Sequence, residues 1–167
     1  KLDKDNEYLI LHLRKSSWSK TNSSDNSHPF KYKNILFAHN GTIYDYKKLL
    51  KDINVSNIRK SDLNILDSEA YFLYVMNTVP LGLKDSFKKA VFQIKKNNKF
   101  SSLSCIFTDG IKIYAYREYN KSPDYYTLYY AKLGSSNMVS SEPVSKRIKW
   151  KILKIIFSIL FVLTITF

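Results

Sequence analysis

The stretch NILFAHNGT, residues 34–42, decides how the rest of the chain is interpreted. Its first five residues have the composition of a strand, and this apolar run ends at the polar pair His39-Asn40 and at Gly41. Residues 43–51 follow with apolar side chains at helical spacing, so the sequence predicts a strand, a sharp turn and a helix. At such a turn the Gly41 N–H and the Asn40 side-chain amide can donate to one developing negative oxygen. The turn is a candidate oxyanion hole, although Asn-Gly is also a common turn signal by itself.

Length and composition indicate one domain with a basic surface. The chain has 167 residues, of which 44% are hydrophobic, and this is enough for one core. It begins at Lys1 without a methionine, and we expect it to be a fragment of a longer protein. The 27 Lys and Arg residues outnumber the 14 Asp and Glu residues, which gives a formal charge of +13. Because these cations are scattered as singles and pairs, we do not expect nucleic-acid binding.

The single cysteine, Cys105, excludes an internal disulfide and a metal site built from thiolates. It lies in the middle of a predicted strand, where alternation of side chains predicts that it is buried as a small hydrophobic residue. One cysteine fits a reducing compartment, and we expect a cytoplasmic protein. No cofactor or metal is expected.

The order of the predicted elements favours an α+β fold. A short strand over residues 8–14 is followed by a polar surface loop over 15–33, a helix begins near Asp67, and another helix spans 83–96. Four further strands are predicted as an antiparallel meander: 102–108, 111–118, 126–132 and 138–140. Strands, then helices, then strands again indicate helices packed against an antiparallel sheet.

The C-terminal segment, residues 151–167, is mostly apolar. Residues 155–167 carry no charge, but the run is shorter than the about 20 apolar residues that a membrane helix needs. Three interpretations stay open: a last pair of buried strands or a helix, a marginal membrane anchor behind a basic flank, or an altered reading frame at the end of a truncated gene. We treat 151–167 as a hydrophobic tail of uncertain status.

Six short segments are distributed along the chain: HLRKSS (12–17), HPF (28–30), HNGT (39–42), DSEA (67–70), TDG (108–110) and SSEP (140–143). In this order they resemble the class II glutamine amidotransferases, which are N-terminal-nucleophile hydrolases. The resemblance is strongest to the small single-domain branch whose relatives include a γ-glutamyl hydrolase of ergothioneine synthesis. It implies that residues 1–150 are a partial domain of this family. The implied fold is a four-layer αββα sandwich that lacks its N-terminal strands.

The resemblance also implies an activity. In this family an N-terminal cysteine attacks the side-chain amide of glutamine, its own α-amino group acts as the base, and the acyl-enzyme is then hydrolysed. The intact enzyme would hydrolyse the γ-amide of glutamine or of a γ-glutamyl compound. No residue of this sequence fills the place of the nucleophile, and Cys105 has no free amino group of its own. We therefore expect the fragment to be inactive.

The family's site residues carry over to matching positions. Asn40 and Gly41 match the oxyanion pair, Arg14 matches the arginine that grips the substrate α-carboxylate, and Asp67 matches the carboxylate that receives the α-ammonium group. Two further residues are expected near the substrate: Ser17 and His39. The remaining motif residues are expected to be scaffolding or to shape the floor of the site: His28, Ser141 and Glu142.

Other classes of function stay open. The chain can be a catalytically inactive relative that serves as a binding or scaffold module, a basic membrane-surface protein anchored by 151–167, or a nucleic-acid binder recognised by steep salt dependence. A synthase partner that receives ammonia, or a homo-oligomer, is possible under the family interpretation. The sequence does not identify the γ-glutamyl substrate or the ammonia acceptor.

Overall fold

The computed structural model describes residues 9–13, 27–53, 65–77, 82–134 and 136–154, and the backbone of 158–160 and 163–166. Its helices are α1 (Lys47–Lys51), α2 (Asp67–Met76), α3 (Leu83–Asn97) and α4 (Pro123–Tyr126). Its first strands are β1 (Ile10–His12), β2 (Phe30–Tyr32), β3 (Ile35–Asn40), β4 (Ser104–Thr108) and β5 (Ile113–Tyr116). Its later strands are β6 (Tyr129–Leu133), β7 (Ser136–Ser140), β8 (Lys151–Ile152), β9 (Ser158–Leu160) and β10 (Leu163–Thr166).

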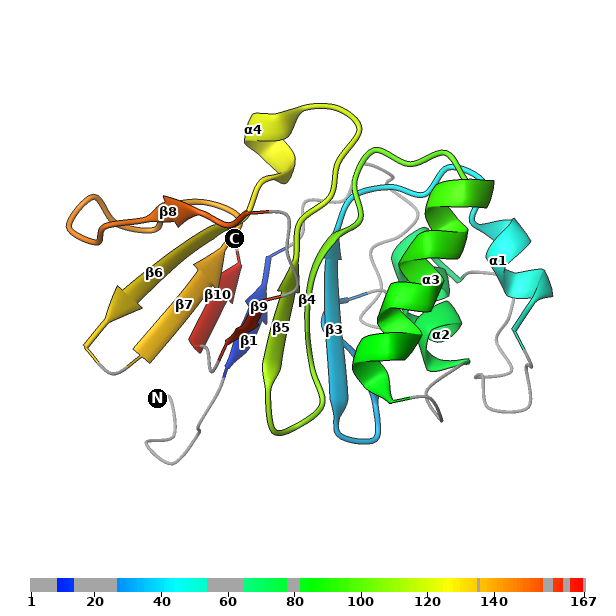
Figure 1. Ribbon diagram of the computed structural model, residues 1–167, viewed down its shortest axis with the longest axis horizontal. Helices are drawn as coiled ribbons and strands as arrows, with labels where there is room; N and C mark the ends of the chain where they lie inside the picture. The colour runs from blue at the N-terminus through cyan, green and yellow to red at the C-terminus, as the bar shows by residue number, and fades with distance from the viewer. Residues whose placement is uncertain are drawn as a thin grey trace.

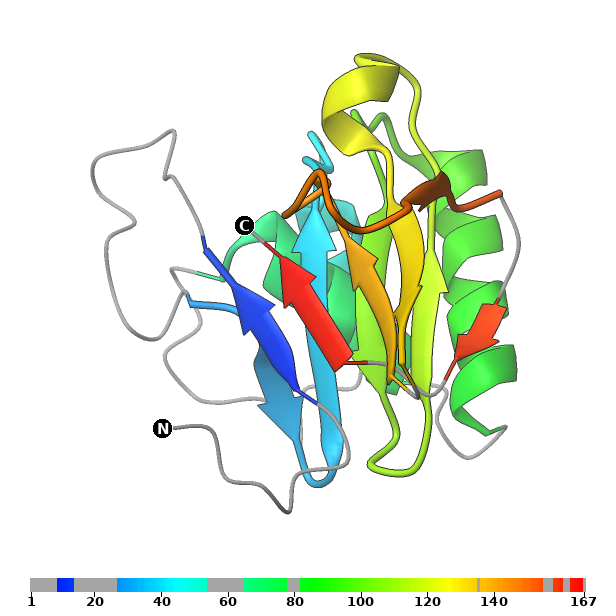
Figure 2. The ribbon, with the colours of Figure 1, turned by 90° about the vertical axis from the view of Figure 1, so that its left-hand side faces the viewer.

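The strands form two five-stranded sheets (Figures 1 and 2). One sheet has the order β2-β3-β4-β5-β9 and is antiparallel throughout. The other has the order β1-β10-β7-β6-β8, in which β10 runs parallel to both of its neighbours. The long central pair β3 and β4 brings Phe37 opposite Phe107 and Asn40 opposite Ser104. The end of β3 is thus fixed in register against the start of β4.

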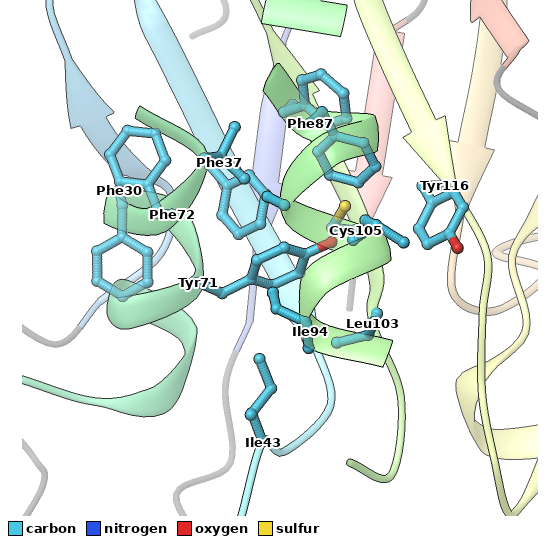
Figure 3. Packing of buried hydrophobic residues seen from close by; sticks show 14 of the residues in the cluster. Phe30, Phe37, Ile43, Tyr71, Phe72, Phe87, Ile94, Leu103, Cys105 and Tyr116 are labelled. Carbon is cyan, nitrogen blue, oxygen red and sulfur yellow. The ribbon is translucent and has the colours of Figure 1, made fainter. Parts of the chain in front are cut away.

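Alternation along β3 and β4 divides the core into two parts. Phe37 and Phe107 point toward the helices, where they pack with Tyr71 of α2 and Phe87 of α3 (Figure 3). Ala38, the next residue of β3, points to the other face and belongs to the apolar cluster that fills the space between the two sheets. Side chains that alternate along a strand produce this division because successive Cβ atoms point to opposite faces.

The molecule is therefore layered as helices, sheet and sheet, an α+β sandwich as predicted (Figure 1). The two predicted long helices are confirmed as α2 and α3, and both pack on the same sheet. Among the described residues, no helix covers the outer face of the sheet that contains β6 and β7. The fourth layer of the family sandwich stays a prediction.

Three local predictions need correction. The four late strands do not form one meander, because β4 and β5 pair in one sheet while β6 and β7 pair in the other. The chain changes sheets through α4, a four-residue helix too short to show periodicity in the sequence. The helix after the Asn-Gly turn begins at Lys47, since residues 44–46 form a turn. The predicted loop over 15–33 contains β2.

The C-terminal segment continues both sheets. The backbone of β9 pairs with β5, and the backbone of β10 lies between β1 and β7. Within the described part of the chain, no helix has the length and apolar character that a membrane crossing requires. The division of the chain at residue 150 stays a prediction.

Candidate active site

A cavity of about 260 Å³ lies where β1, β3 and β7 end. Segments that are distant in sequence supply its lining: His12 and Leu13 at the end of β1, His28, the turn from His39 to Thr42, Leu66 to Ser68 at the start of α2, Ser104 to Ile106 of β4, Tyr125 and Tyr126 of α4, and Ser141 and Glu142 after β7. The cavity thus brings together three of the residues that the family resemblance assigns to the site: Asn40, Gly41 and Asp67. Its volume is that of a pocket for a small molecule such as an amino acid.

The backbone after β3 leaves one amide available to a ligand. The next three N–H groups along the chain are used: Thr42 donates to Ser101 Oγ at 2.9 Å, Ile43 to Asp67 Oδ2 at 2.8 Å, and Tyr44 to the Lys99 carbonyl at 3.0 Å. The Gly41 N–H donates to no other group in the described part of the chain. Since buried amides are nearly always bonded, an unused donor at a cavity wall can bind a ligand oxygen.

Close packing explains why residue 41 is glycine. A Cβ built there would collide with the Ser102 carbonyl oxygen and would lie 2.7 Å from its carbon and 2.8 Å from His39 Nε2. Real Cβ atoms do not approach other atoms this closely, so any side chain would displace the turn. The Gly41 backbone is thus packed closely against the segment that leads into β4.

The Asn40 side chain supplies the second donor. Its Nδ2 donates to the Tyr125 carbonyl at 3.4 Å, a long hydrogen bond that identifies the nitrogen because a carbonyl can only accept. The second N–H of the same group has no partner in the described part of the chain, and Asn40 lines the cavity. One amide side chain and one backbone N–H, on adjacent residues, form the pair of donors that an oxyanion hole needs.

His39 connects this corner to α2. The ring is buried, with 3% of its surface exposed; its Nε2 lies 3.0 Å from the Ser102 carbonyl and its Nδ1 lies 2.8 Å from Ser68 Oγ. The carbonyl accepts only, so Nε2 carries the proton and Nδ1 accepts from the Ser68 hydroxyl. Burial lowers the pKa of His39, against the opposing influences of the Asp67 charge and the Ser102 hydrogen bond. The neutral imidazole therefore ties three segments of the site together.

Asp67 begins α2 without capping it. The N-cap position is Leu66, and Asp67 in the first turn points its carboxylate to the Ile43 N–H. This hydrogen bond places a negative charge two residues beyond the candidate oxyanion hole, on the wall of the same cavity. A carboxylate at the edge of a pocket can receive an ammonium group of a ligand.

Cys105 is buried, as predicted, and its environment does not activate a thiolate. Only 2% of its surface is exposed, and its sulfur lies beside the Tyr71 hydroxyl in the helix-facing core (Figure 3). Burial raises the pKa of the thiol well above its ordinary value, against the smaller opposite influence of Tyr71. A nucleophilic cysteine requires the reverse, so Cys105 does not fill that role.

Two predicted substrate-binding residues, Arg14 and Ser17, lie outside the described residues. Leu13, which directly precedes Arg14, lines the cavity together with His12. The His12 and His28 rings lie 4.2 Å apart, and His28 packs on Phe30. Within the described ranges, no group of His, Cys, Asp and Glu side chains could hold a metal ion.

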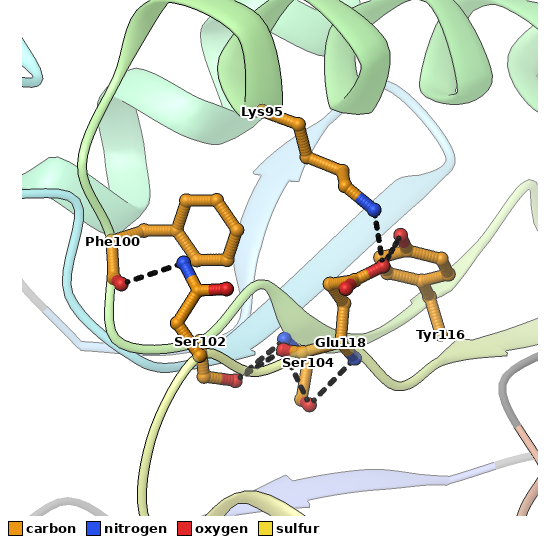
Figure 4. Close-up of polar contacts among 7 residues, drawn as sticks. Lys95, Phe100, Ser102, Ser104, Tyr116 and Glu118 are labelled. Carbon is orange, nitrogen blue, oxygen red and sulfur yellow. Dashed lines mark hydrogen bonds and ion pairs between the residues drawn. The ribbon is translucent and has the colours of Figure 1, made fainter.

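Sequence reasoning missed the contribution of α4. Tyr125 holds the Asn40 amide, and the Tyr126 carbonyl accepts from Ser104 Oγ at 2.8 Å. Ser104 Oγ also lies 3.2 Å from the Glu118 N–H, and the Glu118 carboxylate pairs with Lys95 of α3 (Figure 4). These are contacts between distant segments, and no local pattern announces them. The available signal was the pair Ser122-Pro123, because proline favours the first position of a helix and Pro123 begins α4.

Comparison with known proteins identifies the family of the chain. A family model described as glutamine amidotransferases class-II matches residues 3–131. An uncharacterized protein of Methanocaldococcus jannaschii is 30% identical over 119 residues, which are 66% of this chain and 32% of that protein. The chain thus spans about a third of the length of this relative.

Solved structures share the fold. A glutamine aminotransferase class-II domain protein from Silicibacter pomeroyi matches with a TM-score of 0.60 at 23% identity, over 79% of this chain and 65% of that one. Glutamine phosphoribosylpyrophosphate amidotransferase from B. subtilis matches with a TM-score of 0.52 at 18% identity, over 74% of this chain and 25% of that one. On the family match, the chain belongs to the class II glutamine amidotransferases. Its sandwich of helices and two sheets is similar to the folds of these structures.

Proposed function

We propose that the cavity binds the γ-glutamyl group of glutamine or of a γ-glutamyl compound and supports hydrolysis of its γ-amide. The observation that carries this proposal is the unused Gly41 N–H beside the Asn40 amide, in one cavity with the Asp67 carboxylate. These groups match the two ends of the substrate. Two donors face the carbonyl oxygen at the scissile bond, and a negative charge faces the α-ammonium group.

In this mechanism the α-amino group of the N-terminal cysteine takes the thiol proton, and the thiolate attacks the amide carbon, so that a C–S bond forms and the carbonyl oxygen becomes an anion. The Gly41 N–H and the Asn40 amide stabilise that oxygen, and the C–N bond breaks when the leaving nitrogen takes the proton back from the α-ammonium group. Water then hydrolyses the thioester to glutamate. The nucleophile of this proposal is an N-terminal cysteine, since Cys105 is buried.

His39 acts in this proposal as a positioning residue beside the substrate. Both ring nitrogens are engaged with Ser68 and Ser102, so the ring orients the groups on either side of it. Ser68 follows Asp67, and the Ser102 carbonyl packs under Gly41. Arg14 would hold the α-carboxylate, and Ser17 would hydrogen-bond the substrate, as the family resemblance implies.

The proposal places the protein in the cytoplasm, where glutamine is available. It also allows a partner: ammonia released in the cavity can pass to a synthase domain or subunit, which would account for the remaining length of the relatives. Gel filtration, with a crosslinked sample as the control, tests whether the protein associates with such a synthase subunit. Hydrolysis that releases free ammonia with no acceptor present would show that the domain works alone.

The test uses the intact protein with its natural N-terminal segment, or this chain fused to an upstream segment that begins Met-Cys. Glutamate and ammonia release from glutamine are measured. Asp67→Asn keeps an acceptor for the Ile43 N–H but removes the charge, and we expect it to raise KM about 10–100-fold, the loss of one charge-assisted hydrogen bond. Glu69→Gln, in the same helical turn, is the matched control and should leave KM unchanged.

Two outcomes would contradict the proposal. If the intact protein hydrolyses glutamine with a KM that neither Asp67→Asn nor Arg14→Ala alters, the residues assigned to the substrate are wrong. If the intact protein binds glutamate, and Asp67→Asn weakens this binding, but no γ-glutamyl compound is hydrolysed, the chain is a binding module that retains the pocket without catalysis.

A further inference from the structure

Ser104, the first residue of β4, has a buried hydroxyl that joins three segments at the wall of the cavity. Its Oγ lies 2.8 Å from the Tyr126 carbonyl oxygen, 3.2 Å from the Glu118 backbone nitrogen and 3.3 Å from the Glu118 carbonyl oxygen (Figure 4 shows the contacts with Glu118). A hydroxyl has one proton, and the nearer carbonyl is that of Tyr126. Ser104 therefore accepts from the Glu118 N–H and donates to the last residue of α4.

The neighbouring carbonyl of α4 fixes the orientation of the Asn40 amide. Tyr125 accepts through its carbonyl from Asn40 Nδ2 at 3.4 Å. If the amide turned by half a rotation, its Oδ1 would face this carbonyl oxygen, and two acceptors repel each other. The Tyr125 carbonyl thus favours the orientation in which Nδ2, with its second N–H, is the group assigned to the oxyanion.

These two carbonyls are the hydrogen-bonded attachment of α4 to the site. The backbone N–H groups of Tyr125 and Tyr126 bond within the helix, to the Ser122 carbonyl. Among the residues that the structure describes, the segment 122–126 makes hydrogen bonds to the rest of the chain only with Ser104 and Asn40. Without the Ser104 hydroxyl, the long bond to Asn40 would be left alone, because α4 has no further hydrogen bond to that part of the protein.

The contacts close a ring around the candidate oxyanion hole. Asn40 of β3 is the register partner of Ser104 of β4. From Ser104 the ring passes to Tyr126 and, along one peptide link, to Tyr125. It returns from the Tyr125 carbonyl to the Asn40 side chain. Because every member is bonded to the next, a change at the Ser104 hydroxyl reaches the Asn40 amide through α4.

We propose that Ser104 is a positioning residue of the oxyanion hole, which acts through α4 to hold the Asn40 amide with Nδ2 as the donor. Its own proton is committed to the Tyr126 carbonyl, so its effect on the reaction passes through Asn40. This inference rests on the proposed function, because the oxyanion arises only if a γ-amide is hydrolysed at this site.

The kinetic test is a double-mutant cycle in the intact protein with glutamine as substrate. Ser104→Ala should lower kcat about 10-fold, a part of the about 100–1,000-fold that the loss of a donor costs, and leave KM within about twofold. In the background of Asn40→Ala, the same substitution should lower kcat less than about twofold further, because the group that Ser104 positions is already absent. A residue that acts on the reaction independently would lower kcat by the same factor in both backgrounds.

Thr108→Val is the matched control. Thr108 is the last residue of the same strand, is fully buried, and accepts at its Oγ1 from the Gly110 N–H at 3.0 Å. It does not line the cavity. The variant therefore removes a buried hydroxyl from β4 away from the site. It should lower the urea midpoint, as Ser104→Ala does, but leave kcat within about twofold of wild type.

Nuclear magnetic resonance measures the same coupling without turnover. In protein labelled with ¹⁵N, the side-chain NH₂ signals of Asn40 are identified by their loss in Asn40→Asp. Ser104→Ala should shift these signals, because the hydrogen bond from Nδ2 to the Tyr125 carbonyl changes. Thr108→Val should leave them in place.

The outcomes separate the two proposals. If glutamine is hydrolysed but Ser104→Ala lowers kcat equally with and without Asn40, does not lower it, or leaves the Asn40 signals unmoved, the positioning role is wrong and the proposed function stands. If the intact protein hydrolyses no γ-glutamyl compound, the proposed function fails and the catalytic role of Ser104 fails with it. A shift of the Asn40 signals would then show a structural coupling alone.

Discussion

Replacement of Gly41 by alanine tests the geometry of the site at its tightest point. The new methyl group would collide with the Ser102 carbonyl oxygen and lie 2.7 Å from the carbonyl carbon, where carbon atoms ordinarily rest about 3.5–4.0 Å apart. Relief requires a movement of roughly 1 Å between the turn and the segment before β4. Because His39 bonds the same carbonyl, the movement is transmitted to the ring.

A displacement of this size should be seen mainly in turnover. Catalytic groups must be held within about 0.5 Å, and a 1 Å misplacement costs about 100-fold in rate. We therefore expect Gly41→Ala to lower kcat about 100-fold, and to raise KM by a smaller factor because the Asp67 carboxylate accepts from the Ile43 N–H of the same turn. Overpacking should also lower the free energy of unfolding by about 1–3 kcal/mol.

The assay is glutamate release by the intact protein, together with urea unfolding of the same preparations. Gly134→Ala is the matched control: it has open space for a Cβ but a φ of 60°, so it should cost about 1–2 kcal/mol in stability without loss of turnover. Turnover of Gly41→Ala within about threefold of wild type, at a stability similar to that of Gly134→Ala, would refute the packing argument.

Other predictions concern the buried groups of the site. His39→Leu leaves the Ser68 hydroxyl and the Ser102 carbonyl without their partner, and it should lower the free energy of unfolding by about 2–6 kcal/mol. His39→Gln can still reach one of these groups and should lower it by about half as much. Equal losses for the two variants in urea titrations would contradict this. The lowered pKa of His39 means that the unfolded chain takes up a proton first as the pH falls below 6.5, so stability should decline from pH 6.5 toward the lower pKa of the folded protein, and this part of the decline should be absent in His39→Gln. Cys105 should resist iodoacetamide at pH 8 in the native protein and react on unfolding in urea, because burial keeps the thiol protonated; rapid alkylation of the folded protein would contradict the assigned burial.

The sequence was informative where a structural feature depends on residues that are neighbours along the chain. The Asn-Gly pair at the end of an apolar run predicted the turn after β3, and alternation through β4 predicted the burial of Cys105. The oxyanion role of Asn40 and Gly41 stays a prediction. The partition of β6 and β7 into a second sheet was not predictable, since both sheets use strands of the same composition. Ser68 and Ser102 acquire their roles only when His39 reaches between them. Such contacts depend on which distant segments pack together, and local propensity does not encode them.

The central claim is that the corner at Asn40 stabilises the oxyanion of γ-amide hydrolysis. Its most direct test is the kcat of Asn40→Ala in the intact protein, measured with KM on the same substrate. Removal of one oxyanion donor should lower kcat about 100–1,000-fold and leave KM within about twofold. A kcat within about threefold of wild type, with the variant fully folded, would contradict the account.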